Sequence, residues 1–345
     1  MILGGGLGWG GRNTLDPVPT PEIQVVVVTA VPTETAAPTD TPQPTETSEP
    51  TLAPTETIVT TAITQETPTP TATPDPFVLP ISTTLGMTWT RPLDGMEMLF
   101  VPDDTFMMGS TDEDTDAEDN EKPAHEVALD AFWLDSTEVT NAQYVAFLNE
   151  MGNQEEEGVT WLDSADDDVR IEEIDGVFQA QDGFADHPVV EVSWYGAQAY
   201  CNWVGTDVIS TTLPTEAQWE YAARGSTATI YPWGDEFDGT LLNYSGNNDF
   251  DRTAPVGSFP DGASWVGALD MAGNVWEWTA DWYDANYYED SPTENPIGPD
   301  EGTYKVLRGG SWYNSQPFVR SASRNYYTPD FTNSDFGYRC VAPPG

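Results

Sequence analysis

The chain has 345 residues and a large excess of acidic side chains, 58 Asp and Glu against 11 Lys and Arg, which gives a formal charge of -47. A charge this negative repels phosphate groups, so the composition excludes nucleic acid and anionic lipid as main partners. Only two histidines, His125 and His187, are present, so a multi-histidine zinc or iron centre cannot be assembled. The length allows one large domain, or two small ones, with a sizeable core.

The first 80 residues differ in composition from the rest of the chain. Residues 31–80 contain 16 Thr and 11 Pro, and no Lys or Arg occurs between Arg12 and Arg91. Such a stretch lacks the apolar periodicity that offsets the entropy of ordering. We therefore expect a disordered Gly-rich start and Thr/Pro-rich linker over residues 1–80, and a globular domain over residues 81–345. The linker composition is typical of a plain tether and also of an O-glycosylated stalk outside the cell.

The N-terminal segment contains no recognisable secretory signal or membrane helix. Residues 1–11 lack a basic region and an apolar core, and the apolar run at residues 25–28 is far shorter than the ~20 residues of a membrane helix. A tether needs something to hold at its free end. We therefore expect a membrane anchor, cell-wall anchor or partner domain upstream of this sequence.

The predicted elements of the globular domain are short and widely spaced. Residues 96–101 and 106–108 are predicted to form a β-hairpin, and residues 126–134 alternate like one strand. After residue 224 the pattern predicts turns and brief strands, so the class is α+β with high coil content. Three helices are expected: one after an N-cap at Thr140, a second beginning at Ser193 and a third starting near residues 214–216.

The acidic residues of the domain are concentrated in two stretches, residues 112–121 and 155–175. Runs of like charge are usually solvated loops, and weak cation binding or adaptation to high salt is the alternative. Neither stretch has the spacing and glycine of a calcium-binding loop.

Eight motifs in fixed order point to a known family. They are E-V-T-N-A-Q-Y at 138–144, H-P-V-V-E-V-S-W at 187–194, A-Y-C-N-W at 199–203, L-P-T-E-A-Q-W-E-Y-A-A-R-G at 213–225, Y-P-W-G-D at 231–235, D-M-A-G-N-V-W-E-W at 270–278, R-G-G-S-W at 308–312 and G-Y-R-C at 337–340. Over residues 86–342 the chain closely resembles the formylglycine-generating enzyme, or sulfatase-modifying factor, family. The resemblance implies a C-type-lectin-like fold with little regular secondary structure.

The same resemblance implies that Cys201 and Cys340 form a disulfide, since family members pair cysteines in these two motifs. Two buried free thiols are the alternative. A structural disulfide is typical of an oxidising compartment, so we expect an extracytoplasmic protein, secreted or tethered to the cell surface.

Calcium is the cofactor that we expect. Asp270 and Glu277 lie seven residues apart in a Gly-containing loop, where two carboxylates and backbone carbonyls can converge on a hard cation. The alternative is that this loop only forms turns and packs the core. The resemblance implies two calcium sites, one at Asp270, Gly273, Val275 and Glu277 and the other at Asn243, Tyr244, Asn248 and Phe250.

The copper chemistry of the family is not expected. Its active members carry two cysteines, five residues apart, after G-G-S-W or G-G-S-Y, because copper(I) requires soft thiolates. Residues 313–320 of this chain, Y-N-S-Q-P-F-V-R, contain no cysteine. A related branch uses iron held by histidines, and neither His125 nor His187 is expected to be a metal ligand.

The remaining functional prediction is ligand binding. Residues 313–336 are rich in Tyr, Ser, Asn, Asp, Phe and Arg, a composition typical of antibody-like binding surfaces and similar to retroelement-diversified proteins of the same fold. The partner would be a protein, peptide or glycan; an enzyme of the same family and a structural stalk are the alternatives. In the competing interpretation, these aromatic side chains only pack against the last strands of the domain. The arginines pair either with internal carboxylates or with a ligand carboxylate. The candidate ligand-binding residues are Tyr313, Asn314, Arg320, Arg324, Tyr326 and Tyr327.

Overall fold

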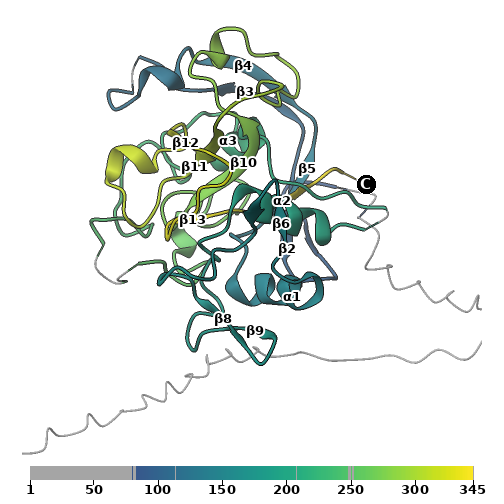
Figure 1. Cartoon of the computed structure of the whole chain (residues 1–345). Coiled ribbons are helices and arrows are strands. Elements are labelled where there is room, and N and C mark those ends of the chain that lie inside the picture. The colour runs from purple at the N-terminus through teal and green to yellow at the C-terminus, as the bar shows by residue number, and fades with distance from the viewer. Residues whose placement is uncertain are drawn as a thin grey trace, which may run out of the picture. The chain divides into compact units, whose positions relative to one another are not determined.

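A computed structural model describes residue 80 and residues 83–344, except residues 113, 207, 248–249 and 251. Almost all of the predicted linker therefore lies outside the described residues. The described part contains three α-helices and many short strands separated by long loops (Figure 1), which confirms the α+β class with high coil content. None of the helices in the described residues has the length and apolar run needed to cross a membrane.

The three helices begin where the sequence predicted. They are α1 (Asn141–Met151), α2 (Trp194–Trp203) and α3 (Glu216–Arg224). The side chains of Thr140, Ser193 and Thr215 each accept a hydrogen bond from the backbone of the first turn. The predicted N-cap at Thr140 is confirmed, and Ser193 and Thr215 cap the other two helices. Each helix buries an apolar face in the core.

The strands form two four-stranded sheets and three small hairpins. One sheet has the order β1-β2-β5-β14 and the other the order β12-β11-β10-β13, in which β10 and β13 are parallel. The hairpins are β3-β4, β6-β7 and β8-β9. The strands are β1 (Thr88–Thr90), β2 (Glu97–Val101), β3 (Asp104–Met108), β4 (His125–Leu129), β5 (Phe132–Asp135), β6 (Glu155–Glu156), β7 (Val159–Thr160), β8 (Ile171–Ile174), β9 (Val177–Ala180), β10 (Trp276–Trp282), β11 (Lys305–Arg308), β12 (Arg324–Tyr327), β13 (Phe336–Gly337) and β14 (Val341–Ala342).

The predicted hairpin between residues 96–101 and 106–108 is wrong. Strand β2 pairs with β1 and β5, whereas β3 pairs with β4, and both β2-β5 and β3-β4 are antiparallel. The two segments thus follow one another along the same ribbon instead of folding back. Pro102 has no N–H to donate, which accounts for the interruption between β2 and β3. The predicted single strand at 126–134 is likewise divided into β4 and β5.

A disulfide links helix α2 to the last strands. Cys201 and Cys340 are bonded, with Cα atoms 5.6 Å apart, and both residues are fully buried in the main hydrophobic core. The predicted pairing is confirmed.

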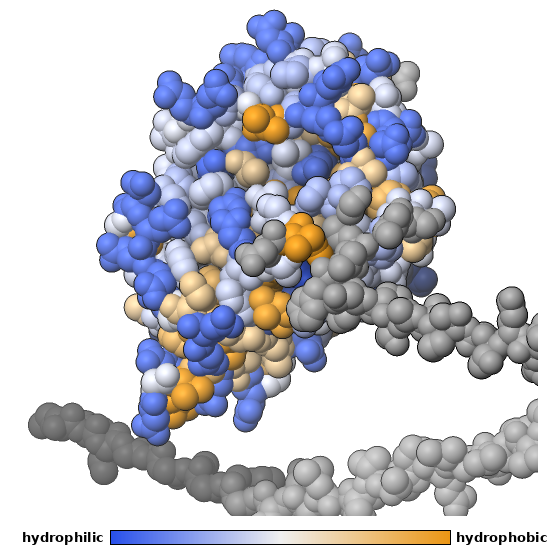
Figure 2. Space-filling view, turned by 90° about the vertical axis from the view of Figure 1, so that its right-hand side faces the viewer, coloured by the Kyte–Doolittle hydropathy of each residue, from blue (hydrophilic) through white to orange (hydrophobic). Residues whose placement is uncertain are grey.

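On the face in Figure 2 most of the surface is hydrophilic, and apolar residues are exposed only in small, separate patches. One such patch lies at the lower end of that face, at the same height as the β8-β9 hairpin in Figure 1. Two apolar side chains of that hairpin, Ile174 and Val177, are about half exposed (49% and 56%).

Candidate functional site

An open groove of about 520 Å³ lies beside the edge strand β12. Segments far apart in the sequence form it (Figure 1). They are two short 3-10 helices, at Asp119–Glu121 and Gln316–Val319, the first residue of β10, the residue before β11, and strand β12. We call it the aromatic groove. Its lining residues are Glu118, Asn120, Trp276, Tyr304, Asn314, Phe318, Arg324, Asn325, Tyr326 and Tyr327.

Stacked rings hold the exposed tyrosines of this groove in place. Tyr326 stacks on Tyr283 with ring centroids 3.9 Å apart, and its ring lies 5.2 Å from that of Tyr304. Tyr327 stacks on Phe331 at 4.5 Å. Tyr326 and Tyr327 are nevertheless 39% and 37% exposed. They present large faces to solvent while having few conformations to lose on binding, as in antibody paratopes.

Arg324 reaches the groove but its charge is satisfied inside the protein. Its Nε and Nη2 donate to the two carboxylate oxygens of Glu216 at 2.7 and 2.9 Å, and Nη1 donates to the Asn120 carbonyl at 2.6 Å. Burial alone would raise the pKa of Glu216, but Arg324 and Arg308 outweigh it and lower that pKa. Of the two predicted partners for Arg324, an internal or a ligand carboxylate, the structure therefore shows the internal one.

Arg320 also pairs internally, outside the aromatic groove. Its guanidinium donates to Glu121 at 2.7 and 2.8 Å and to Asp114 at 2.8 Å, and only 2% of the residue is exposed. Part of the first acidic stretch thus neutralises a buried arginine instead of forming only a solvated loop. Neither Arg320 nor Arg324 offers a free guanidinium to a ligand carboxylate.

The segment that follows the G-G-S-W motif forms one end of the groove. Gly310 has a φ of +74°, and a Cβ there would lie 2.6 Å from the Phe318 carbonyl oxygen, so only glycine fits. Asn314 is fixed by hydrogen bonds from Ser311 N and Oγ to its Oδ1 at 3.0 and 2.7 Å. Tyr313 is 71% exposed but does not line the groove. The chain's two cysteines are joined in the disulfide, so this site has no thiol.

Behind the groove, the loop that enters β10 carries the expected calcium ligands. Asp270 and Asn274 have φ angles of +58° and +61°, and a Cβ on Gly273 would lie 2.2 Å from the Asn243 carbonyl oxygen, so the loop is tightly folded against Asn243. Asp270 is 7% exposed and accepts a hydrogen bond from Gly257 N at 2.6 Å.

A second buried carboxylate, Glu138, which was not predicted as a ligand, adds to the negative charge of Asp270. Glu138 is fully buried; its Oε1 accepts from Asn274 Nδ2 at 3.0 Å, while its Oε2 receives no hydrogen bond from an N–H or hydroxyl donor among the described residues. Burial raises the pKa of Glu138 and of Asp270. An unpartnered buried oxygen beside a second carboxylate fits a hard cation at this place.

Glu277 differs from the expectation. Both of its oxygens accept from Arg339, each at 2.7 Å, and Trp219 Nε1 also donates to one of them at 2.8 Å. In this structure its carboxylate is engaged by protein donors, so Asp270 and Glu138 are the better-placed carboxylates for a cation. The backbone carbonyls of Gly273 and Val275 belong to the same loop.

The second expected calcium site is only partly within the described residues, because Asn248 lies outside them. Asn243 Nδ2 donates to the Arg252 carbonyl at 2.8 Å and to Asn274 Oδ1 at 3.2 Å, which ties this region to the Asp270 loop. The Tyr244 carbonyl accepts from Asn247 N at 3.0 Å, and the Phe250 ring packs against Phe259.

Both histidines are held by neighbouring residues. His125 Nδ1 lies 3.1 Å from the Pro123 carbonyl, and His187 Nδ1 lies 3.0 Å from Thr253 Oγ1. Burial lowers the pKa of His187.

Sequence reasoning found Asn314, Arg324, Tyr326 and Tyr327 among the groove residues, because they share one stretch of unusual composition. It missed residues that reach the groove from other segments, and no local signal pointed to them. These are Glu118, Asn120, Trp276 and Tyr304.

Comparison with known proteins identifies the fold and the family. Residues 86–343 match the model of the sulfatase-modifying factor enzyme 1-like domain. The chain belongs to this family. The structure of PvdO from Pseudomonas aeruginosa is similar to this one with a TM-score of 0.63 and 24% sequence identity, covering 76% of this chain and 100% of PvdO. At that identity the likeness establishes the fold alone.

Several curated family relatives are more similar in sequence. The serine/threonine-protein kinase Pkn1 of Chlamydia trachomatis is 40% identical over 248 residues, which cover 71% of this chain but only 38% of the kinase. The formylglycine-generating enzyme of Streptomyces coelicolor is 35% identical, covering 73% of this chain and 90% of that enzyme. The inactive C-alpha-formylglycine-generating enzyme 2 of Mus musculus is 32% identical, covering 72% of this chain and 86% of that protein. The family thus includes both active and inactive members.

Proposed function

We propose that this domain is an extracytoplasmic, calcium-stabilised interaction module that binds a protein, peptide or glycan in the aromatic groove and does not oxidise cysteine. The observation that carries the proposal is the groove itself: stacked, half-exposed tyrosines stand next to the segment where the catalytic family members carry cysteines, and that segment has none. The inactive mouse relative shows that the family scaffold is retained without the activity.

The charge of the groove indicates which ligands it accepts. Glu118 is the only charged side chain among its lining residues that is exposed, because Arg324 is buried against Glu216. An anionic ligand would meet no free cation in this groove and would be repelled by Glu118. The expected ligand is therefore neutral or cationic, such as a glycan or a Lys- or Arg-bearing peptide, since tyrosine faces bind both sugars and cations.

Calcium would be held by the carboxylates of Asp270 and Glu138 together with carbonyls of the loop that enters β10. Its role would be structural: it would neutralise buried negative charge and fix the loop from which Trp276 enters the groove. The disulfide between Cys201 and Cys340 supports an oxidising, extracytoplasmic setting.

The test is a screen of wild-type protein on arrays of glycans and of peptides that differ in Lys/Arg and Asp/Glu content. Hits from the neutral or cationic sets should weaken about thirtyfold or more when Tyr326 and Tyr327 are both changed to Ser, the effect expected for truncated aromatic anchors. Ile297→Ser is the matched control, because Ile297 is 67% exposed and lies outside the groove lining. Hits confined to acidic peptides, or hits insensitive to the tyrosine changes, would contradict the proposal.

A further inference from the structure

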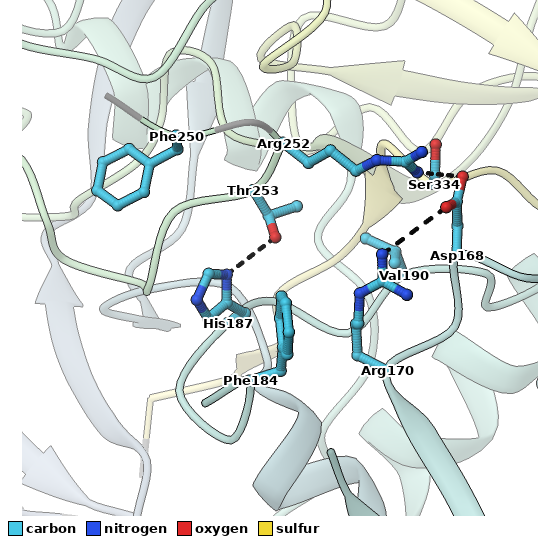
Figure 3. A pocket seen from close by; sticks show the side chains of 9 residues that line it. All are labelled: Asp168, Arg170, Phe184, His187, Val190, Phe250, Arg252, Thr253 and Ser334. Carbon is cyan, nitrogen blue, oxygen red and sulfur yellow. Dashed lines mark hydrogen bonds and ion pairs between the residues drawn. The ribbon is translucent and has the colours of Figure 1, made fainter. Parts of the chain in front are cut away.

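A second cavity, of about 430 Å³, lies where four loops meet (Figure 3), and it shares no lining residue with the aromatic groove. Arg170 precedes β8, Phe184 and His187 follow β9, Arg252 and Thr253 belong to the loop after residue 250, and Ser334 precedes β13. Figure 3 shows the side chains of Arg170 and Arg252 extending toward the same carboxylate, that of Asp168, with Phe184, His187 and Phe250 on the other side.

These two arginines are exceptional in this protein. Three of the ten basic side chains in the described residues are partly exposed: Lys122 at 32%, Arg170 at 20% and Arg252 at 44%. The other seven are buried in the domain, namely Arg91, Arg224, Lys305, Arg308, Arg320, Arg324 and Arg339. In a strongly acidic domain, two of the three accessible cations therefore converge on one cavity.

Asp168 demonstrates that a carboxylate fits between them. One of its oxygens pairs with Arg252 Nη1, and the other lies 3.7 Å from Arg170 Nη2. Asp168 is itself 26% exposed, so both ion pairs face water and contribute little to stability. The side chain of Arg252 is 44% exposed and its guanidinium lies 5.8 Å from the centre of the Trp312 ring, so it stays open to solvent beside Asp168.

The opposite side of the cavity is apolar and aromatic. The guanidinium of Arg170 lies 5.0 Å from the centre of the Phe184 ring, and Phe184 packs against His187 with ring centroids 4.9 Å apart. Phe250 lies on this same side of the cavity in Figure 3. A cavity of a few hundred cubic ångströms with one apolar wall and a few convergent polar groups has the properties of a small-ligand site.

We infer that this cavity binds an organic carboxylate with an apolar body, whose carboxylate exchanges with Asp168 between Arg170 and Arg252 while its body contacts Phe184 and Phe250. A planar carboxylate matches the guanidinium fork, as Asp168 already does. A phosphate dianion is a poorer fit, because the carboxylates of Asp166 and Glu191 lie within 4.8 Å of that of Asp168 and repel the additional charge. The carboxylate can come from a free acid or from a peptide C-terminus.

The test is calorimetric titration of the full chain with N-acetyl-phenylalanine, using N-acetyl-phenylalaninamide as the uncharged control. The acid should bind at least about tenfold more tightly than the amide, the usual effect of a charge-assisted hydrogen bond. Arg252→Gln should weaken binding of the acid by a similar factor, and Arg252→Lys should weaken it by less. Asp168→Asn should instead tighten it about two- to fivefold, because it removes the competing internal carboxylate.

Two controls separate this site from general electrostatics and from the aromatic groove. Lys122→Gln removes the third accessible cation outside the cavity, and Tyr326→Ser alters the groove; neither should change the affinity. A peptide ending in free phenylalanine, titrated in parallel, distinguishes the sources: tighter binding than the free acid indicates a chain terminus, and weaker binding a small metabolite. Equal binding of acid and amide, no binding of the acid, or weakening by Asp168→Asn would overturn the inference.

Discussion

Arg324→Leu tests whether the arginine beside the aromatic groove stabilises the fold or contacts the ligand. The side chain makes three hydrogen bonds, two to Glu216 and one to the Asn120 carbonyl, and its guanidinium lies 4.2 Å from the centre of the Tyr288 ring. Its loss leaves the carboxylate of Glu216, which is 3% exposed, with the Tyr288 hydroxyl at 3.2 Å and Arg308 at 3.7 Å. Breaking a buried ion pair by removing one partner costs about 3–5 kcal/mol.

This cost should appear in urea unfolding as a lower midpoint at an unchanged slope. In a domain of this size it corresponds to a fall in Tm of about 6–20 °C. Arg252→Leu is the matched control: Arg252 is 44% exposed, so its replacement should change stability by less than about 1 kcal/mol.

Two further measurements identify the buried pair as the cause. Replacing both Arg324 and Glu216 with leucine should recover part of the loss, because no charge is then left unpaired. Arg324 and Arg308 lower the pKa of Glu216, so the pair contributes stability above the ordinary pKa of Glu, and this contribution is lost as the pH falls through the lowered folded-state pKa. The difference between wild type and Arg324→Leu should therefore shrink toward acid pH. A loss below about 1 kcal/mol accompanied by lost ligand binding would refute the structural role.

Three other perturbations have clear expected outcomes. Changing Cys201 and Cys340 together to Ala should lower the free energy of unfolding by up to about 4–5 kcal/mol, measured in urea, because the disulfide closes a long loop. Calcium should raise the Tm of chelated protein, and Asp270→Asn should abolish that increase; a Tm indifferent to chelator would contradict the calcium proposal. Burial raises the pKa of Asp281 to about 7, so its protonation contributes stability at acid pH that is lost as the pH rises through 7. The stability of Asp281→Asn relative to wild type should therefore increase as the pH rises from 5 to 8. A difference in Tm that stays constant across that range would contradict this.

The parts of the fold that depend on local chemistry could be predicted from the sequence. Thr140, Ser193 and Thr215 cap their helices because a side-chain oxygen close in sequence satisfies free backbone N–H groups. The strand pairing could not be predicted in the same way, because a proline such as Pro102 is compatible with two structures. It can form a turn between two paired strands, or it can interrupt one continuous ribbon. Which one occurs depends on the distant partners β4 and β5.

The site could be predicted only where it is contiguous in sequence. The composition of residues 313–336 predicted Tyr326 and Tyr327 as binding residues, whereas Tyr304 and Glu118 reach the same groove from other segments of the chain. For Arg324 the sequence allowed either an internal or a ligand carboxylate as partner. Only the three-dimensional arrangement, which places Glu216 of α3 beside β12, decides between them. No sequence signal brought Arg170 and Arg252 together at this cavity, since none of the eight motifs contains either arginine.

The claim that the domain binds a ligand without oxidising it is tested most directly by an activity assay. The purified protein, loaded with calcium and supplied with copper(I) and oxygen, is incubated with a peptide containing C-x-P-x-R, and aldehyde formation is followed by mass spectrometry. The absence of a cysteine pair after the G-G-S-W motif predicts no aldehyde above the level of a protein-free control. Catalytic turnover of cysteine to formylglycine would contradict the account.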